Sequence, residues 1–247
     1  MYSLLIMTIL IFLPLPIMAS TARKTGNGYK AVFEGVFSVG VAMMMMFMIA
    51  ASTGNPIGKA MLTGLQSFCE AAAQTDQIVS MLGLQDVSMS ERISTLTKVY
   101  SYAINSLPAI TMMCATVLAY LEYRIISRMS QKMKNPLPML APISEFSMPR
   151  RAVWGWIFIY LMSMGVALAG FSAGDVLLIN SQLLFQFVFQ IQGVAVMFYF
   201  CKMKKLNNIV PIILCLIVAA SAMGQMLLCL LGFMDLGFGL RRMMKKR

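Results

Sequence analysis

The sequence predicts an all-α fold, a polytopic bundle of transmembrane helices in one domain covering residues 1–247. Of the 247 residues, 59% are hydrophobic and only 12% are charged, whereas soluble domains carry about 25% charged residues. The mean hydropathy is +0.77. The apolar residues come in long runs separated by charged clusters, which is typical of helices that cross a bilayer. We expect six spans, or seven if the final apolar stretch folds as a helical hairpin.

The first two apolar runs are each long enough to form one span. The run Tyr2–Ala19 contains Pro14 and Pro16, which should kink or end its helix because proline lacks the amide donor that a helix interior needs. A cleaved signal peptide is the alternative, but no basic region precedes the run, and we expect a retained helix. The second predicted span is Ala31–Ala51.

The segment 52–98 is more polar than the rest of the chain and should lie outside the cytoplasm. Asn55-Pro56 is expected to break the second helix. Apolar residues then recur at helical spacing, at Met61, Leu65, Phe68 and Ala72. This amphipathic pattern predicts a helix that lies on the membrane surface or caps the bundle rather than spanning it.

A third span should belong to a long helix from about residue 90 to residue 130. Ser88 or Ser90, placed before Glu91, should cap its N-terminus. Pro108 should kink it.

Three apolar runs remain, and basic segments flank them. The runs are Val153–Phe171, Leu177–Cys201 and Ile209–Leu240. A Pro-rich basic loop, 132–151, precedes them, and a basic tail, 241–247, follows them. We expect the loop to be cytoplasmic.

The basic tail conflicts with a topology of six spans. Basic clusters follow the first, third and fifth runs, so the positive-inside rule places the N-terminus outside. A sixth single span would then leave the tail outside as well. A break near Ser221–Gly224 would turn the last run into a hairpin and return the tail to the cytoplasm. One span with an external tail is the alternative.

Polar side chains inside the fifth run are the first candidates for a functional site. Three glutamines recur at every fourth residue, Gln182, Gln186 and Gln190. This spacing places them on one helix face, which Asp175 extends. Because amides facing hydrocarbon are unfavourable, the face should bind a small molecule or ion, or hydrogen-bond to other helices. Asn180 and Gln192 lie off this face and should pair with neighbouring helices.

Charged residues at the ends of the runs are candidates for a charge cluster or a docking surface. They are Glu34, Glu122, Arg124, Asp235 and Arg242. Glu34 should form a solvated salt bridge with Lys30, while Asp235 should pair with Arg242 or another base of the tail. Glu122 and Arg124 should join Arg128 at the cytoplasmic face.

Several kinds of chemistry are not expected from this chain. It contains no histidine, and its five scattered cysteines match neither a metal-ligand spacing nor a disulfide framework. Phosphate-binding glycine loops, nucleophile elbows and paired-carboxylate motifs are absent from the sequence. We therefore expect no enzyme activity, no metal and no cofactor. The net charge of +11 is attributed to membrane topology rather than to nucleic-acid binding.

Short segments of the chain resemble the YybS-like family of predicted integral membrane proteins found in Firmicutes, which carries a domain of unknown function. The segments are Pro14-Leu15-Pro16-Ile17 with Ala22-Arg23, Gln192-Gly193-Val194-Ala195 with Tyr199-Phe200, and Leu231–Phe238 with Arg241-Arg242. That family is remotely similar to the substrate-binding S components of energy-coupling-factor transporters, which capture a vitamin or metal and dock on a coupling subunit served by ATPases. The alanine-rich docking motif typical of their first helix is not found here.

The resemblance and the glutamine face together predict a small-molecule-binding component of a transport system. It would be a multi-pass protein of the bacterial cytoplasmic membrane, with a coupling subunit or another membrane complex as partner. The segment 56–88 would close the site as a lid. The alternative is a membrane scaffold or interaction protein of an envelope or signalling complex.

Overall fold

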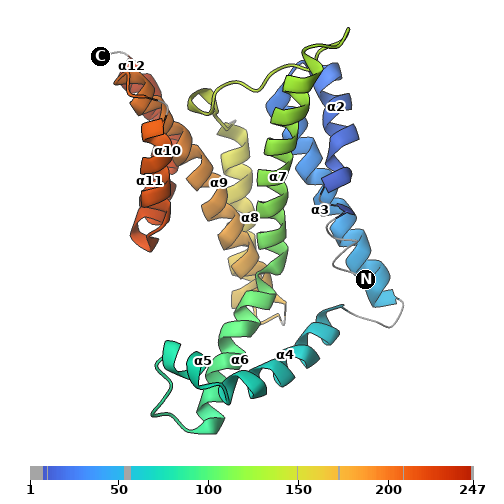
Figure 1. Ribbon diagram of the computed structural model, residues 1–247, viewed down its shortest axis with the longest axis vertical. Helices are drawn as coiled ribbons and strands as arrows, with labels where there is room; N and C mark the ends of the chain where they lie inside the picture. The colour runs from blue at the N-terminus through green and yellow to red at the C-terminus, as the bar shows by residue number, and fades with distance from the viewer. Residues whose placement is uncertain are drawn as a thin grey trace.

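The computed structural model of the protein describes residues 8–9, 11–52, 57–148, 150–171, 173–207 and 209–245, and within these ranges it is helical and contains no β-strand (Figure 1). In chain order the elements are α2 (Pro14–Thr25), α3 (Gly28–Ser52), α4 (Ile57–Ala73), α5 (Asp76–Met81), α6 (Met89–Asn105), α7 (Leu107–Ser130), the 3-10 helix η1 (Ile143–Glu145), α8 (Arg150–Leu168), α9 (Gly174–Met203), α10 (Ile209–Ala219), α11 (Ala222–Phe238) and α12 (Leu240–Lys245). The all-α prediction is confirmed for this part of the chain.

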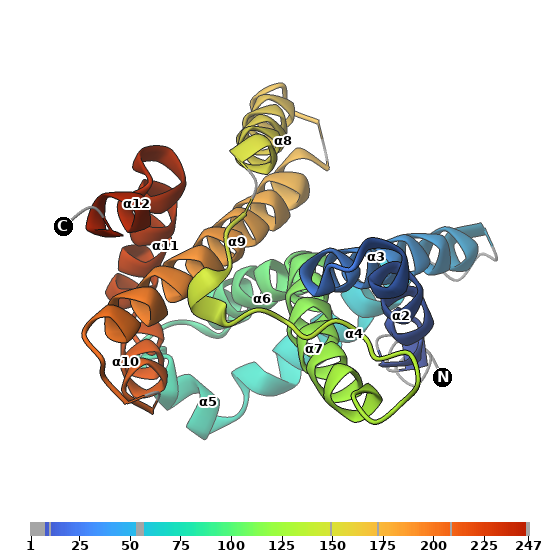
Figure 2. The same cartoon turned by 90° about the horizontal axis from the view of Figure 1, so that it is seen from above.

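The helices that position the site pack in two sets, one around α7 and one around α9. Helices α2, α3 and α7 pack together, α8 packs on α9, and α11 packs on α9 from another side. Seen from above, α9 runs diagonally from α8 toward α10 and α11 (Figure 2). Helix α9 therefore contacts more elements than any other described helix, and it positions the polar groups described below.

The kink predicted at the two prolines of the first run is confirmed as a bend at Leu13, and the prolines begin the helix that follows it. Helical residues 11–12 lead to a bend at Leu13, and α2 starts at Pro14. Both prolines lie in the first turn of α2, where a backbone amide has no helical acceptor to lose. Gly26, with φ of +64°, ends the helix in the left-handed conformation. The predicted break at Asn55-Pro56 lies outside the described residues.

The group of α2, α3 and α7 encloses a small apolar core and fastens the loop that follows α7. Tyr123 is fully buried in this core, and its hydroxyl donates to the carbonyl oxygen of Pro138 at 2.8 Å. The hydroxyl of Ser130 accepts a hydrogen bond from the amide of Leu137 at 2.9 Å. The Pro-rich loop is thus folded back against the end of α7.

The amphipathic segment packs on the protein itself. Helix α4 lies across α6, and Leu65, Cys69 and Ala72 are buried there together with Leu96. Phe68 is half-exposed, with its ring 4.9 Å from that of Tyr100. The side chain of Met61 lies outside the described residues. The predicted apolar stripe is therefore covered mainly by α6.

The long helix predicted from residue 90 to residue 130 is two helices. Helix α6 ends at Asn105 and α7 begins at Leu107, with Pro108 as its second residue. Proline fits the first turn of a helix but not its interior, so the expected kink is a complete break. Asn180 of α9 bridges it, donating to the carbonyl oxygen of Asn105 at 2.6 Å and accepting from the amide of Ala109 at 2.8 Å.

The predicted cap of α6 is confirmed as a capping box. The backbone amide of Ser88 donates to a carboxylate oxygen of Glu91 at 3.3 Å, and the Ser88 hydroxyl donates to the same oxygen at 2.8 Å.

Replacing Ser88 by alanine should lower the free energy of unfolding by about 1 kcal/mol, because the cap satisfies amides that have no helical partner. Ser94 is the matched control, since it is an exposed serine further along α6 and lies outside the capping box. Hydrogen exchange of the first turn of α6 would report the loss locally. Equal effects of the two alanine variants would contradict a capping role for Ser88.

The break predicted in the last apolar run is confirmed. Helices α10 and α11 are bent by 119° at their junction, where the hydroxyl of Ser221 accepts from the amide of Gly224 at 3.0 Å. A Cβ on Gly224 would lie 1.9 Å from the carbonyl oxygen of Val218. Helix α12 then lies at the same end of the molecule as the loop that follows α7 (Figure 1).

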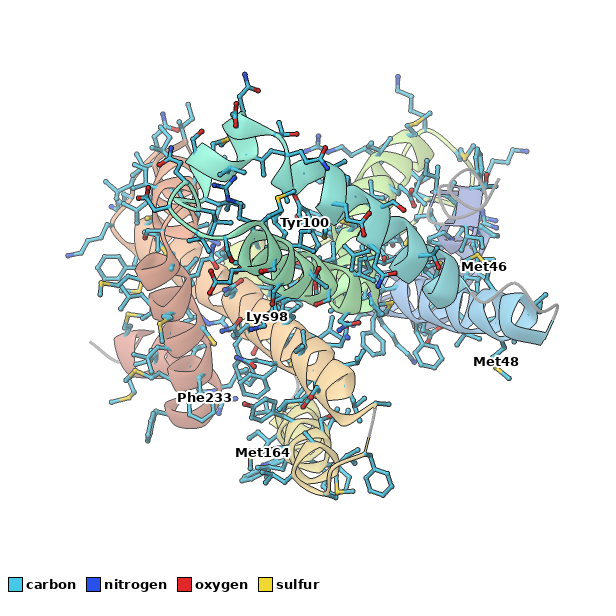
Figure 3. All side chains as sticks on the ribbon, turned by 90° about the horizontal axis from the view of Figure 1, so that it is seen from below. Met46, Met48, Lys98, Tyr100, Met164 and Phe233 are labelled. Atoms are coloured by element: carbon cyan, nitrogen blue, oxygen red, sulfur yellow. The ribbon has the colours of Figure 1, made fainter. Side chains whose placement is uncertain are left out.

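Two of the described helices, and a third span if a bent pair counts as one, can cross a membrane. Within the described ranges, α7 and α9 are long and apolar enough to cross a membrane, and the bent pair α10–α11 makes a third span if it counts as one. Residues Val153–Leu168 form a shorter apolar helix. Large apolar side chains such as Met48 and Met164 are exposed on the outer surfaces of their helices (Figure 3). The number of six spans stays a prediction.

Candidate functional site

The site is built on a crossing of α9 and α11 at which the two backbones touch. A Cβ on Gly193 would lie 2.0 Å from the carbonyl oxygen of Leu228, and a Cβ on Gly232 would lie 1.9 Å from that of Phe189. Real Cβ atoms cannot approach so closely, so glycine is required on both helices. Close contact of this kind is a common mode of helix association in membranes.

The crossing brings Gln192 of α9 against Asp235 of α11. Gln192 is fully buried, and its amide nitrogen donates to Oδ2 of Asp235 at 2.7 Å. Its carbonyl oxygen accepts from the backbone amide of Met148 at 3.2 Å. The expectation that Gln192 pairs with other elements is confirmed.

Arg241 completes the network from the start of α12. Its Nε and Nη2 atoms donate to Oδ2 of Asp235 at 2.9 and 2.7 Å, and its backbone amide donates to Oδ1 at 3.1 Å. Its Nη1 atom donates to the carbonyl oxygens of Ser144 and Phe146 at 3.1 and 2.7 Å. We call Gln192, Asp235 and Arg241, with these two carbonyl groups, the clasp.

The clasp confirms one of the two alternatives predicted for Asp235, pairing with a base of the tail other than Arg242. Asp235 pairs with Arg241, a base of the tail, and Arg242 makes no ion pair within the described part of the chain. Gly239, with φ of +70°, ends α11 in the left-handed conformation. The chain therefore turns at once, and the first arginine of the pair faces back to Asp235 while the second remains exposed.

A cavity of about 590 Å³ lies beside the clasp. It is lined by Ser144, Glu145, Ser147, Met148, Tyr199, Asp235, Leu236, Gly239, Arg241 and Arg242. Both acids of this lining are paired, Asp235 with Arg241 at 2.7 Å and Glu145 with Lys202 at 3.1 Å. The charged group of the lining that has no ion pair among the described residues is Arg242. The cavity therefore presents one positive charge and several hydroxyl groups.

The predicted glutamine face lies elsewhere on α9. Gln182 is exposed, Gln186 and Gln190 are half-buried, and none of the three side chains hydrogen-bonds to another described residue. They do not line the cavity beside the clasp. Asp175 is exposed in the first turn of α9. The structure thus shows no hydrogen bonds from these glutamines to other described helices, and binding at this face stays a prediction.

The remaining charged candidates are separate from the clasp. Glu34 accepts a short hydrogen bond from the hydroxyl of Thr21 and lies 3.9 Å from Lys30, so its predicted salt bridge is confirmed. Glu122 and Arg124 do not form an ion pair. They are two positions apart in α7, and side chains at such positions point about 200° apart around the helix axis. Oε2 of Glu122 is buried and has no hydrogen-bond partner in the part that the structure describes.

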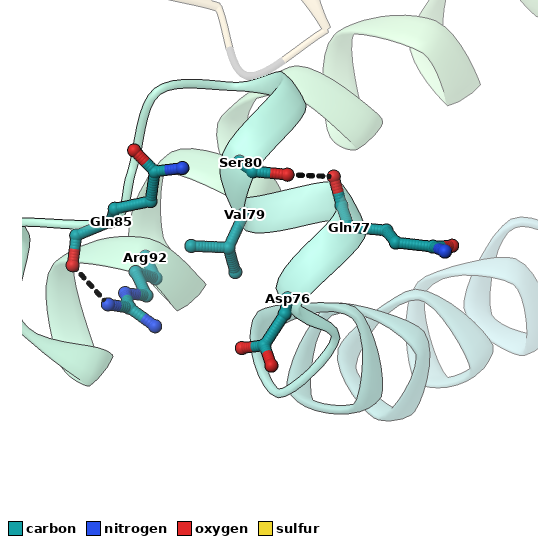
Figure 4. Close-up of a pocket in the computed structure, with 6 residues that line it drawn as sticks. All are labelled: Asp76, Gln77, Val79, Ser80, Gln85 and Arg92. Atoms are coloured by element: carbon teal, nitrogen blue, oxygen red, sulfur yellow. Dashed lines mark hydrogen bonds between the residues drawn. The ribbon is translucent and has the colours of Figure 1, made fainter.

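A second cavity, of about 410 Å³, lies between α5 and α6 (Figure 4). It is lined by Asp76, Gln77, Val79, Ser80, Gln85 and Arg92. Its guanidinium is already used, because Arg92 donates to the carbonyl oxygens of Val87 and Gln85 at 2.9 and 2.6 Å. These bonds close the loop between α5 and α6, and we assign the cavity no ligand.

Apolar helices long enough to cross a bilayer place this chain in the class of α-helical membrane proteins. It belongs to the family described as "Predicted membrane protein (DUF2232)", which matches residues 1–236. It is also similar to "Uncharacterized protein YybS" of Bacillus subtilis (strain 168), with 22% identity over 138 residues.

That match covers 56% of this chain and 44% of YybS, so it spans less than half of the length of that relative. No solved structure matches the chain. The resemblance to YybS-like proteins is confirmed, whereas similarity to S components is not shown. Two of the segments that carry the resemblance, around Gln192-Gly193 and Gly232–Asp235, are in contact at the crossing.

Proposed function

We propose that this protein binds a small anionic molecule in the cavity beside the clasp, as a non-catalytic component of a membrane transport system. The observation that carries the proposal is a polar cavity of about 590 Å³ with Arg242 as its charged group without an ion pair. Small-molecule sites commonly measure about 300–1,000 Å³. A guanidinium binds carboxylate and phosphate groups in a planar, two-pronged geometry.

The residues that line the cavity are suited to binding a ligand rather than to catalysing a reaction. The hydroxyls of Ser144, Ser147 and Tyr199 can donate to the oxygens of an anion placed against Arg242. The chain offers no histidine as a general base. Leu236 and Met148 supply apolar surface for the rest of the ligand. A carboxylic acid or phosphate monoester with a compact apolar part fits these groups.

The clasp also supports a topology for the protein. Because Arg241 is bonded to Ser144 and Phe146, the tail and the basic loop lie at one end of the molecule. The positive-inside rule favours this end as the cytoplasmic side. A hairpin formed by α10 and α11 gives seven crossings of the bacterial cytoplasmic membrane, with the tail inside. The cavity then lies on the cytoplasmic side, and the segment 57–88 lies at the opposite end of the molecule (Figure 1).

Replacing Arg242 by glutamine should weaken anion binding by about 10- to 100-fold, the equivalent of losing one charge-assisted hydrogen-bonding group of about 1.5–3 kcal/mol. The measurement is the shift in melting temperature of the purified protein in detergent, with a panel of monocarboxylates, dicarboxylates and phosphate monoesters. Lys204→Gln is the matched control, since it removes one positive charge from the same end of the molecule but outside the cavity lining. Equal losses in both variants, or no stabilising anion, would refute the site.

The transport role can be tested by identifying the proteins that co-purify with this protein. A native pull-down followed by mass spectrometry should recover a membrane coupling subunit with its ATPases. Recovery of an envelope or signalling assembly instead would favour the scaffold function. Both outcomes leave the test of the anion site unaffected, because that test uses the isolated protein.

A further inference from the structure

We propose that the outer face of α7 binds an anionic phospholipid, with the headgroup between Arg124 and Arg128 and the acyl chains along the apolar side chains of the same face. This surface, which we call the lipid face, consists of Val117, Leu121, Arg124, Ile125, Arg128 and Met129. None of these residues lines the cavity beside the clasp. The proposal therefore does not depend on the anion site.

The lipid face is not covered by any described helix. Its four apolar side chains are 47–69% exposed, and both arginines are exposed. The buried side of α7 lies opposite, where Ala119 and Tyr123 pack in the core shared with α2 and α3. Leu121 and Tyr123 are two positions apart and therefore point about 200° apart around the helix axis.

The place of this face in the membrane identifies what covers it. Helix α7 is long and apolar enough to cross a bilayer, and it carries no charged residue from Leu107 to Leu121. An exposed apolar face on a spanning helix is in contact with lipid. Arg124 and Arg128 lie in the last two turns before Ser130, where a long basic side chain reaches the headgroup region.

The two arginines carry positive charge that the described chain does not neutralise. Neither forms an ion pair with a described residue. Glu122 points to another side of α7, and Glu34 lies 3.9 Å from Lys30. Two basic groups without acidic neighbours favour a headgroup with net negative charge, such as phosphatidylglycerol, over a zwitterionic one that brings its own ammonium group.

The spacing of the arginines suits one phosphodiester. Residues four apart on a helix are neighbours, with Cβ atoms about 5–6 Å from each other, so both guanidinium groups can reach the same phosphate. Each guanidinium presents parallel N–H donors that match phosphate oxygens. The pair can therefore hold the headgroup from two sides.

The apolar part of the face matches the length of one leaflet. Half of a hydrocarbon core of about 30 Å is about 15 Å, which corresponds to about ten helical residues. Counted back from Arg128, this distance reaches the level of Val117. Acyl chains would thus lie against Ile125, Leu121 and Val117. A soluble phosphate would leave these side chains unused, which is why we assign the face to a lipid.

The test is photo-cross-linking of the full-length protein in vesicles of phosphatidylcholine with a minor share of phosphatidylglycerol. One or the other lipid carries a photoreactive group in its acyl chain, and mass spectrometry locates the labelled residues. Photoreactive phosphatidylglycerol should label the lipid face in preference to photoreactive phosphatidylcholine. Arg124→Gln and Arg128→Gln should each lower this preference about fivefold, and the double variant should be labelled almost equally by the two lipids.

Two control variants separate this site from a general attraction of lipids to basic residues. Lys134→Gln removes an exposed charge from the loop that follows α7, outside the lipid face. Arg242→Gln removes the charge of the cavity beside the clasp. Both should keep the wild-type preference for phosphatidylglycerol. Unchanged melting temperatures would show that all variants are folded.

Three results would overturn the proposal. One is equal labelling of the wild-type lipid face by the two lipids. Another is a loss of preference in Lys134→Gln as large as that in Arg128→Gln, which would show diffuse attraction. The third is displacement of phosphatidylglycerol from the face by inorganic phosphate, which would assign the arginines to a soluble anion.

Discussion

Replacing Gly232 by alanine should destabilise the protein by about 3 kcal/mol, at the upper end of what overpacking a close contact produces. The added Cβ would meet the carbonyl oxygen of Phe189 at 1.9 Å and the amide nitrogen of Gly193 at 2.9 Å. Both are backbone atoms and cannot rotate away, so α9 and α11 must separate. The measurement is thermal unfolding of the purified protein in detergent.

Gly237 provides the matched control in the same helix. A Cβ there would meet no described atom within 4 Å. Gly237→Ala should leave stability unchanged or raise it by about 0.5–1 kcal/mol, because alanine favours the helix over glycine. If the two alanine variants behaved alike, the backbone contact at the crossing would not be a determinant of the fold.

Replacing Asp235 by alanine should lower the stability by about 3–5 kcal/mol, the range for removing one member of a buried ion pair. The side chains of Arg241 and Asp235 are only 13% and 4% exposed. The variant leaves the guanidinium with two carbonyl oxygens and no counter-charge, and it leaves the amide of Gln192 without its acceptor.

Two further variants separate the charge effect from general loss of packing. Glu145→Gln breaks the solvent-exposed pair with Lys202, and exposed pairs contribute only about 0–1 kcal/mol. The double variant Asp235→Ala, Arg241→Met should be more stable than Asp235→Ala alone, because it buries no uncompensated charge. A double variant that is less stable than the single one would show that the arginine acts mainly through Ser144 and Phe146.

Local features of this fold could be predicted because short-range chemistry determines them. Proline is disfavoured in the interior of a helix, so Pro108 marks a helix start. The Ser88–Glu91 spacing fits a capping box, and the Ser221–Gly224 segment breaks an apolar run that is too long for one span. Gln192 and Asn180 were correctly expected to pair with neighbours because they lie off the glutamine face. In each case the deciding residues lie within a few positions of one another.

The partners of those residues could not be predicted, because they depend on how distant helices cross. The choice of Arg241 over Arg242 as the partner of Asp235 depends on the left-handed turn at Gly239, which the sequence pattern alone did not reveal. The contact of Gly193 with α11 places Gln192 next to a residue 43 positions away. One signal was present in the sequence: glycine inside an apolar helix is unfavourable relative to alanine and usually has a packing reason. It could have pointed to both helices, though not to their pairing.

The clasp has a consequence for the order in which the protein matures. During synthesis, the loop with Ser144 and Phe146 and the whole of α9 leave the ribosome well before Arg241 does. Until that residue arrives, Asp235 lacks its counter-charge and the two loop carbonyls lack their donor. The junction of loop, α9 and α11 therefore closes last. A nascent chain halted before this residue would present an open junction in which the carboxylate of Asp235 has no counter-charge.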